Sequence, residues 1–110
     1  MVVVVFELEM RPDADLAEYE TRATRMDELV RQMPGFISYS AYSSEGGHEC
    51  VVARFESEEA LHAWHYQPEH VETQQRGREA FFEQYRVQVC TPIREYQFQR
   101  QPQLEPQAQA

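Results

Sequence analysis

Alternating apolar side chains mark the beginning of the chain. Between Val2 and Met10, apolar residues occupy every second position, and Glu7 and Glu9 stand between them in the second half. The segment is also rich in valine, whose branched side chain suits a pleated sheet. A period of two over nine residues is typical of a half-buried strand, so we predict a β-strand here.

The next segment has the period of a helix. From Ala14 to Met33, apolar residues recur every three or four positions and charged residues lie between them. Pro12-Asp13 precedes this pattern and Pro34-Gly35 follows it, which are the expected start and stop signals. We predict one helix with a single buried stripe. The stripe consists of Leu16, Tyr19, Ala23, Met26, Leu29, Val30 and Met33.

Two further strand-like runs follow, from Phe36 to Ser43 and from Glu49 to Phe55. The linking residues Ser44-Glu45-Gly46-Gly47 contain two glycines, which can adopt the positive φ angles that tight turns require. The two runs therefore predict an antiparallel hairpin.

A broken helix is predicted after the hairpin. Ser57 is followed by Glu58 and Glu59, a helix-start pattern in which the hydroxyl accepts from free backbone N–H groups and the acids favour the positive end of the dipole. Pro68 interrupts the helix, and a second helical piece is expected from Glu69. Side chains on the two sides of this bend can converge on a pocket.

The last predicted strand runs from Phe82 to Phe98 and contains Pro92, which suggests an edge strand or a bulge. Residues 99–110 are polar and rich in proline and glutamine, so we expect a flexible tail. The chain is accordingly divided into one domain over residues 1–98 and a tail over residues 99–110.

The order of these elements is β-α-β-β-α-β, the pattern of the ferredoxin-like α+β fold. In that fold two helices cover one face of a four-stranded antiparallel sheet. The other face carries residues such as Val3, Val5 and Val52, which are too apolar for water, so we expect it to pack against a second copy of the chain. The predicted partner is therefore the protein itself, as a homodimer.

Composition narrows the classes of partner. The chain of 110 residues has a formal net charge of −9, which argues against nucleic acid and anionic membranes because both select clustered basic residues. The apolar start from Met1 to Phe6 is far shorter than a membrane span of about 20 residues and has no basic region or cleavage site. We expect a cytoplasmic protein.

Metal chemistry is not predicted. His62 and His65 lie three residues apart on a predicted helix and His48 lies in the hairpin, but a zinc or iron site needs three or four converging ligands. A glycine-rich phosphate loop and a dinucleotide fingerprint are also missing from the sequence. The expected cofactor is therefore none.

Several short motifs together resemble the antibiotic biosynthesis monooxygenase family, whose members form dimeric α+β barrels. The resemblance covers about residues 2–98. Its motifs are Met33-Pro34-Gly35-Phe36, Phe55-Glu56-Ser57-Glu58-Glu59-Ala60-Leu61, Trp64 with Pro68-Glu69-His70, and Gln75-Arg76-Gly77-Arg78 before Phe82 and Tyr85.

The resemblance implies a pocket between sheet and helices and, as the first functional hypothesis, a cofactor-independent monooxygenase. Its substrates would be dioxygen and an aromatic polyketide-like phenol, anthrone or hydroquinone. Such a substrate, once deprotonated, can itself reduce dioxygen, so the protein need supply only a base, a dry cavity and positioning.

Two alternative functions stay open, and a third is argued against by the sequence. Some relatives isomerise or degrade small oxygenated molecules by proton transfer alone, and a non-catalytic dimeric ligand-binding module would need no base. Haem-degrading relatives use an asparagine on the first strand and a later histidine that binds iron. This chain has Phe6-Glu7 and Gln74 at those places, which argues against haem degradation.

His70 is the candidate catalytic residue, because an imidazole takes and returns protons near neutral pH. Trp64, the only tryptophan, is expected either to line the pocket or to belong to the core. Gln74 lies one helical turn after His70 and can share its face. Four aromatic residues on predicted strands complete the expected pocket lining. They are Phe6, Tyr39, Phe55 and Tyr85.

Overall fold

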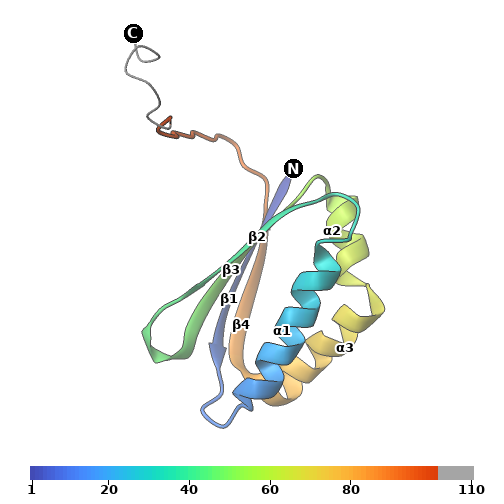
Figure 1. Ribbon diagram of the computed structural model, residues 1–110, viewed down its shortest axis with the longest axis vertical. Helices are drawn as coiled ribbons and strands as arrows, with labels where there is room; N and C mark the ends of the chain where they lie inside the picture. Colours follow the sequence, from blue (N-terminus) through green and yellow to red (C-terminus); the bar gives the residue numbers. More distant parts are fainter. Residues whose placement is uncertain (102–110) are drawn as a thin grey trace.

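The computed structural model describes residues 1–101 and shows the predicted α+β fold. The strands form one antiparallel sheet in the order β2-β3-β1-β4 (Figure 1). The ferredoxin-like fold predicted from the element order is therefore confirmed. The elements are β1 (Val2–Met10), α1 (Leu16–Val30), β2 (Phe36–Ser43), β3 (His48–Phe55), α2 (Glu58–His65), α3 (Pro68–Arg76) and β4 (Phe82–Cys90).

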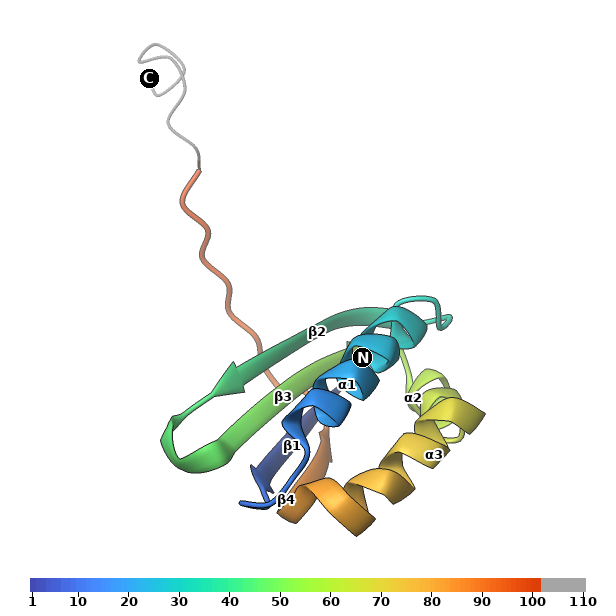
Figure 2. The ribbon, with the colours of Figure 1, turned by 60° about the horizontal axis from the view of Figure 1, so that its bottom comes forward.

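All three helices lie on the same side of the sheet (Figure 2). The register places Val4 of β1 opposite Ala53 of β3 and Val89 of β4, so these residues point toward the helices. Val5 is opposite Val52, and this pair belongs to the face without helices. The alternation read in the sequence thus separates a helix-covered face from an open face.

The main core lies where α1 and α2 meet one end of the sheet. It contains Val2 of β1, Val30 of α1, Ala53 and Phe55 of β3, and Trp64 of α2. Burial of these apolar side chains is the main favourable contribution to the free energy of folding. This core fixes the position of α2 and, with it, the bend that precedes α3.

Both helix starts that frame the core have side-chain caps. Asp15 accepts a hydrogen bond from the backbone N–H of Glu18 at 3.0 Å at the start of α1. Ser57 accepts from the N–H of Ala60 at 3.1 Å, as the sequence predicts for the start of α2. Local sequence therefore determines where these two helices begin.

The turn between α3 and β4 was not predicted. Residues Gly77–Phe81 form one turn of π-helix (η2), which leads directly into β4. A Cβ atom at Gly77 would lie 2.5 Å from the ring of Phe82, so only glycine permits this close packing. The turn buries Phe81 and directs Phe82 toward β1 and α1.

The final strand is shorter than expected. It was predicted from Phe82 to Phe98, but β4 ends at Cys90, and residues 91–101 extend away from the body (Figures 1 and 2). Pro92, which lacks a backbone N–H, therefore follows the strand rather than forming a bulge in it. Of the predicted tail over residues 99–110, residues 102–110 lie outside the described part of the chain.

Candidate functional site

Trp64 and His70 stack on each other across the bend between α2 and α3. Their ring centroids are 4.0 Å apart and the ring planes differ by 14°. Pro68 begins α3, and Gln67 caps it by accepting from the backbone N–H of His70 at 2.8 Å. The cap and the proline direct the chain so that His70 returns over the indole.

The hydrogen bonds of His70 define its tautomer. Its Nδ1 atom lies 2.8 Å from the carbonyl oxygen of Trp64. A carbonyl oxygen only accepts hydrogen bonds, so Nδ1 carries the hydrogen and Nε2 of the neutral ring has a free electron pair. Within residues 1–101, the Nε2 atom of His70 has no hydrogen-bond partner. In the same residues, every fully buried side-chain nitrogen or oxygen has a partner, so Nε2 must have some exposed surface. Nε2 is therefore not fully buried, and its electron pair is free to accept a proton.

The surroundings of His70 keep it neutral. Burial lowers its pKa below the ordinary value of 6.5, and the nearby His65 lowers it further, while the hydrogen bond to the Trp64 carbonyl raises it. Burial has the largest effect, because a partly desolvated imidazolium loses hydration. At neutral pH the ring is thus unprotonated, which is the form that accepts a proton.

Gln74 shares the face of His70, as its spacing predicts. Its side-chain Nε2 donates to the backbone oxygen of His65 at 2.9 Å and lies 3.2 Å from Nδ1 of His70. The hydrogen on Nδ1 is already directed to the carbonyl of Trp64, so Gln74 supports the position of the ring through contact. The structure thus brings together Trp64, His70 and Gln74.

Two ion pairs hold α3, and with it His70, against α1. Arg25 donates twice to Glu69 at 2.9 Å, and Arg76 donates twice to Glu18 at 2.7 and 2.8 Å. The hydrogen bond from Arg76 lowers the pKa of Glu18 to about 2. Paired donors of this fork geometry fix orientation as well as distance, so they set the spacing between the helices.

Phe6 and Tyr85 form a second group on the sheet. Their rings meet edge to face at 5.5 Å, and Phe82 contacts both. Val87 and Val89 follow Tyr85 on the helix side of β4. They are nevertheless 50% and 51% exposed. This row is apolar surface that the helices leave uncovered, and it suits a flat apolar ligand.

Tyr39 and Phe55 have more limited access. Phe55 is only 1% exposed and packs edge to face against Phe36 at 5.9 Å, so it has almost no surface left for a ligand. Tyr39 is half-buried on β2 beside the main core, and burial raises the pKa of its phenol. The structure places these two predicted residues on the β3 and β2 side of α1, apart from the Phe6–Tyr85 contact.

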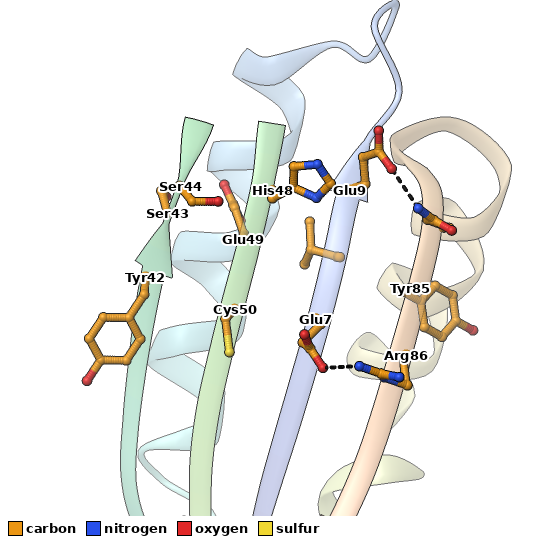
Figure 3. Close-up of a pocket in the computed structure, with 12 residues that line it drawn as sticks. Glu7, Glu9, Tyr42, Ser43, Ser44, His48, Glu49, Cys50, Tyr85 and Arg86 are labelled. Atoms are coloured by element: carbon orange, nitrogen blue, oxygen red, sulfur yellow. Dashed lines mark hydrogen bonds and ion pairs between the residues drawn. The ribbon is translucent and has the colours of Figure 1, made fainter. Parts of the chain in front are cut away.

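A hollow of about 530 Å³ lies on the open face of the sheet. Figure 3 looks onto this face, so the helices lie behind the strands. Polar side chains dominate it, with Arg86 donating to Glu7 at 2.8 Å and Gln84 donating to Glu9 at 2.7 Å. Among the predicted site residues only Tyr85 borders this hollow. It is therefore a separate feature from the His70 region.

The described part of the chain has no cluster of three or more His, Cys, Asp or Glu side chains that could hold a metal ion. His62 and His65 instead contact the ring of Tyr66, with centroid distances of 4.6 and 4.8 Å. None of the helices within residues 1–101 is long and apolar enough to cross a membrane.

Sequence reasoning missed two aromatic residues of this region, Phe81 and Phe82. Phe82 joins Phe6 and Tyr85 on the sheet, and Phe81 packs against Tyr19 at 5.5 Å. The signal was present, because Gly77 at the end of a predicted helix is followed by an aromatic pair after three intervening residues. Its meaning depends on the π-turn, which the spacing of apolar residues does not indicate.

Fold and site together define a small α+β protein of the ferredoxin-like class with a histidine at its helix bend. The sequence matches the family model described as "Antibiotic biosynthesis monooxygenase" over residues 1–76. The chain therefore belongs to the antibiotic biosynthesis monooxygenase family.

Two individual proteins are similar to the chain. The chain is 30% identical over 81 residues to the uncharacterized protein YqjZ of Bacillus subtilis, covering 74% of this chain and 71% of that protein. The structure of Rv0793 from Mycobacterium tuberculosis is 27% identical and superposes with a TM-score of 0.76, covering 87% of this chain and 98% of the other.

SnoaB from Streptomyces nogalater, described as a cofactor-independent oxygenase, superposes with a TM-score of 0.72 over 86% of this chain and 94% of its own. Its identity to this chain is 16%, so the likeness concerns the fold.

Proposed function

We propose that the protein is a cofactor-independent monooxygenase that oxidises an aromatic phenol, anthrone or hydroquinone with dioxygen. The observation that carries the proposal is the state of His70: Nδ1 is fixed by the Trp64 carbonyl, while Nε2 is unpaired and not fully buried. Membership of the family and the fold shared with SnoaB support the same class of reaction.

The reaction needs only proton transfer from the protein. Nε2 of His70 removes a proton from the activated carbon or hydroxyl of the substrate, which leaves an electron-rich anion. This anion gives one electron to dioxygen, and the resulting pair combines into a peroxide. For an anthrone, the protonated His70 returns its proton to the peroxide. The second hydrogen of the same carbon then leaves as a proton while the O–O bond breaks, so that one oxygen stays as the new carbonyl and the other leaves as hydroxide, which takes up this proton to give water. The substrate supplies all the electrons.

Trp64 supports this role through His70 rather than by stacking on the substrate. One face of its indole is covered by the imidazole, and the side chain belongs to the main core with 9% exposure. The ligand surface in this proposal is the uncovered row of Tyr85, Val87 and Val89 together with Phe6. An apolar row excludes water and so strengthens the electrostatic effect of the base.

Dioxygen uptake tests the proposal directly. The purified protein is treated with a chelator and assayed with anthrones, hydroquinones and catechols, alongside His70→Ala and the control His62→Ala. His62 is an exposed histidine of the preceding helix. We expect uptake that falls roughly a hundredfold or more in His70→Ala and stays unchanged in the control.

Two outcomes would contradict the proposal. Uptake that survives in His70→Ala would remove His70 as the base. A lack of uptake with every substrate, together with proton exchange or isomerisation that needs His70, would instead show a proton-transfer enzyme that does not use dioxygen.

We propose further that the protein acts as a homodimer. The open sheet face carries the half-buried apolar pair Val5 and Val52, and the arm after β4 exposes Ile93, Tyr96 and Phe98 to solvent. Ile93 is 95% exposed, which is costly for a large apolar side chain and favours a partner. Sedimentation velocity should give twice the chain mass. A monomer across the micromolar range would refute the dimer.

A further inference from the structure

The backbone carbonyl of Trp64, in the last turn of α2, accepts hydrogen bonds from two donors. One is the backbone N–H of Gln67 at 3.1 Å, and the other is Nδ1 of His70 at 2.8 Å. In a continuous α-helix this oxygen would accept from the backbone N–H four residues later. Residue 68 is a proline, which has no N–H. Pro68 therefore leaves one acceptor position of the oxygen free for the ring of His70.

Gln67 bonds to both sides of this contact. Its backbone N–H donates to the carbonyl of Trp64, and its side-chain Oε1 accepts from the backbone N–H of His70 at 2.8 Å. Its own carbonyl accepts from the N–H of Val71 at 2.9 Å, within the first turn of α3. A single residue thus fixes both the acceptor and the backbone from which the imidazole extends.

Stacking on the indole does not by itself distinguish the two edges of the imidazole. The contact between Trp64 and His70, at 4.0 Å and 14°, restrains the plane of the ring. A half-turn about the Cβ–Cγ bond of His70 would keep that plane and exchange the positions of Nδ1 and Cδ2. The hydrogen bond to the carbonyl is therefore the contact that selects one ring orientation.

The two groups beside Nδ1 favour opposite tautomers. The carbonyl of Trp64 only accepts, so it requires a hydrogen on Nδ1. The side-chain nitrogen of Gln74, at 3.2 Å, only donates and would require a free electron pair there. The carbonyl is closer and holds the hydrogen on Nδ1. If the carbonyl moved away, Gln74 would donate to Nδ1 and the ring hydrogen would move to Nε2.

We propose that Gln67 and Pro68 are positioning residues of His70, which hold the Trp64 carbonyl against Nδ1 and so keep Nε2 free to accept a proton. Both act through the imidazole. The inference rests on the proposed function, because the electron pair of Nε2 is the base in that reaction. It makes the helix break a part of the catalytic arrangement.

The same contact also suits the protonated ring. When Nε2 takes a proton from the substrate, Nδ1 keeps its hydrogen, and the imidazolium lies beside a carbonyl at the carboxyl-terminal end of α2. This end of a helix favours positive charge. Burial lowers the pKa of His70, and the hydrogen bond to Trp64 counteracts part of that effect. The carbonyl therefore supports the base before and after proton transfer.

Nitrogen NMR of the ring tests the positioning without turnover. In protein with ¹⁵N-labelled histidine, the frequencies of Nδ1 and Nε2 show which nitrogen carries the hydrogen. The chain has four histidines, and the signals of His70 are those that disappear in His70→Ala. Spectra are recorded well above pH ~6.5, the ordinary pKa of histidine, so that the ring is neutral. The native protein should carry the hydrogen on Nδ1.

Gln67→Ala and Pro68→Ala should both move the hydrogen toward Nε2. The first removes the bond to the backbone of His70, and the second supplies an N–H that competes for the carbonyl of Trp64. In each variant, dioxygen uptake should fall about tenfold or more, as expected for a misplaced base. Gln67→Ser restores a common helix cap, so it should return the hydrogen to Nδ1 and recover most of the uptake.

Gln75→Ala is the matched control, because it makes the same change at an exposed position of α3. It should keep the native tautomer and the native uptake. Urea unfolding shows whether each variant is folded, and should Gln67→Ala fail to fold, Pro68→Ala alone decides. The proposal is overturned if the native ring already carries its hydrogen on Nε2, or if the hydrogen stays on Nδ1 in both variants. An equal shift in Gln75→Ala would overturn it as well.

The two proposals fail in different ways. A tautomer shift in Gln67→Ala and Pro68→Ala, without dioxygen uptake by any of the proteins, would leave the positioning of the ring standing and remove the oxygenase. Uptake that depends on His70, with the same tautomer in all variants, would do the reverse.

Discussion

Gly35 connects α1 to β2 at a point where the backbone passes close to α2. Its φ angle is +82°, and a Cβ atom there would lie 2.6 Å from the Cβ of Ala60. For Gly35→Ala, the left-handed conformation costs about 1–2 kcal/mol. Relief of the clash by moving α2 costs about 1–3 kcal/mol more. The expected loss is about 2–5 kcal/mol, a large part of the 5–15 kcal/mol typical of a domain.

Two further variants separate these contributions. Gly47 has a φ of +77° but nothing within 4 Å of its Cβ position, so Gly47→Ala should show only the conformational cost of about 1–2 kcal/mol. The double variant Gly35→Ala with Ala60→Gly removes the clash. Its free energy of unfolding should recover most of the packing cost of the single variant. The recovery is reduced by up to about 1 kcal/mol, because a glycine within α2 is itself destabilising.

Urea unfolding followed by the fluorescence of the single tryptophan measures all of these values. The reasoning is refuted if Gly35→Ala is no less stable than Gly47→Ala, or if the double variant is as unstable as the single one. A shift of α2 would also move Trp64, which lies one turn after Ala60 in the same helix. We therefore expect Gly35→Ala to lower dioxygen uptake.

Three other predictions concern the helix layer. Trp64→Ala should lower the free energy of unfolding by about 3–5 kcal/mol, measured by urea denaturation, because it empties a core position. In Glu18→Gln, the melting temperature should fall less steeply than in the native protein as the pH is lowered. The native fold loses the contribution of Glu18 as the pH falls from about 4.5 to about 2, where the carboxylate bonded to Arg76 becomes protonated. The imidazole of His70 should titrate below 6.5 by NMR, and an unshifted value would contradict its burial. Its contribution to stability is fully present above 6.5 and is lost as the pH falls through the lower pKa of the folded state.

Much of the fold was predictable because its signals are local. The alternation in β1, the Ser57 cap and the break at Pro68 each depend on a few neighbouring residues, and the structure has all of them. The end of β4 was not predictable in this way. The alternation continues past Cys90, but the pairing of β4 with β1 ends with Val3 opposite Cys90, and the same register reaches the first residue of β1, Val2, only one position later. Strand length depends on the neighbouring strand as well as on its own pattern.

In the candidate site too, some features follow from local sequence and others only from the tertiary structure. Sequence alone indicated that Trp64, His70 and Gln74 flank a helix bend, because proline and helical spacing determine that arrangement within a short segment. Only the tertiary structure showed that the imidazole lies on the indole with Nδ1 bound to a carbonyl, since ring orientation depends on packing between helices. The hydrogen bond between Tyr19 and Glu49 likewise joins residues 30 positions apart, on α1 and β3. Such contacts arise from the register of the sheet and the placement of a helix above it, which no local pattern in the chain specifies.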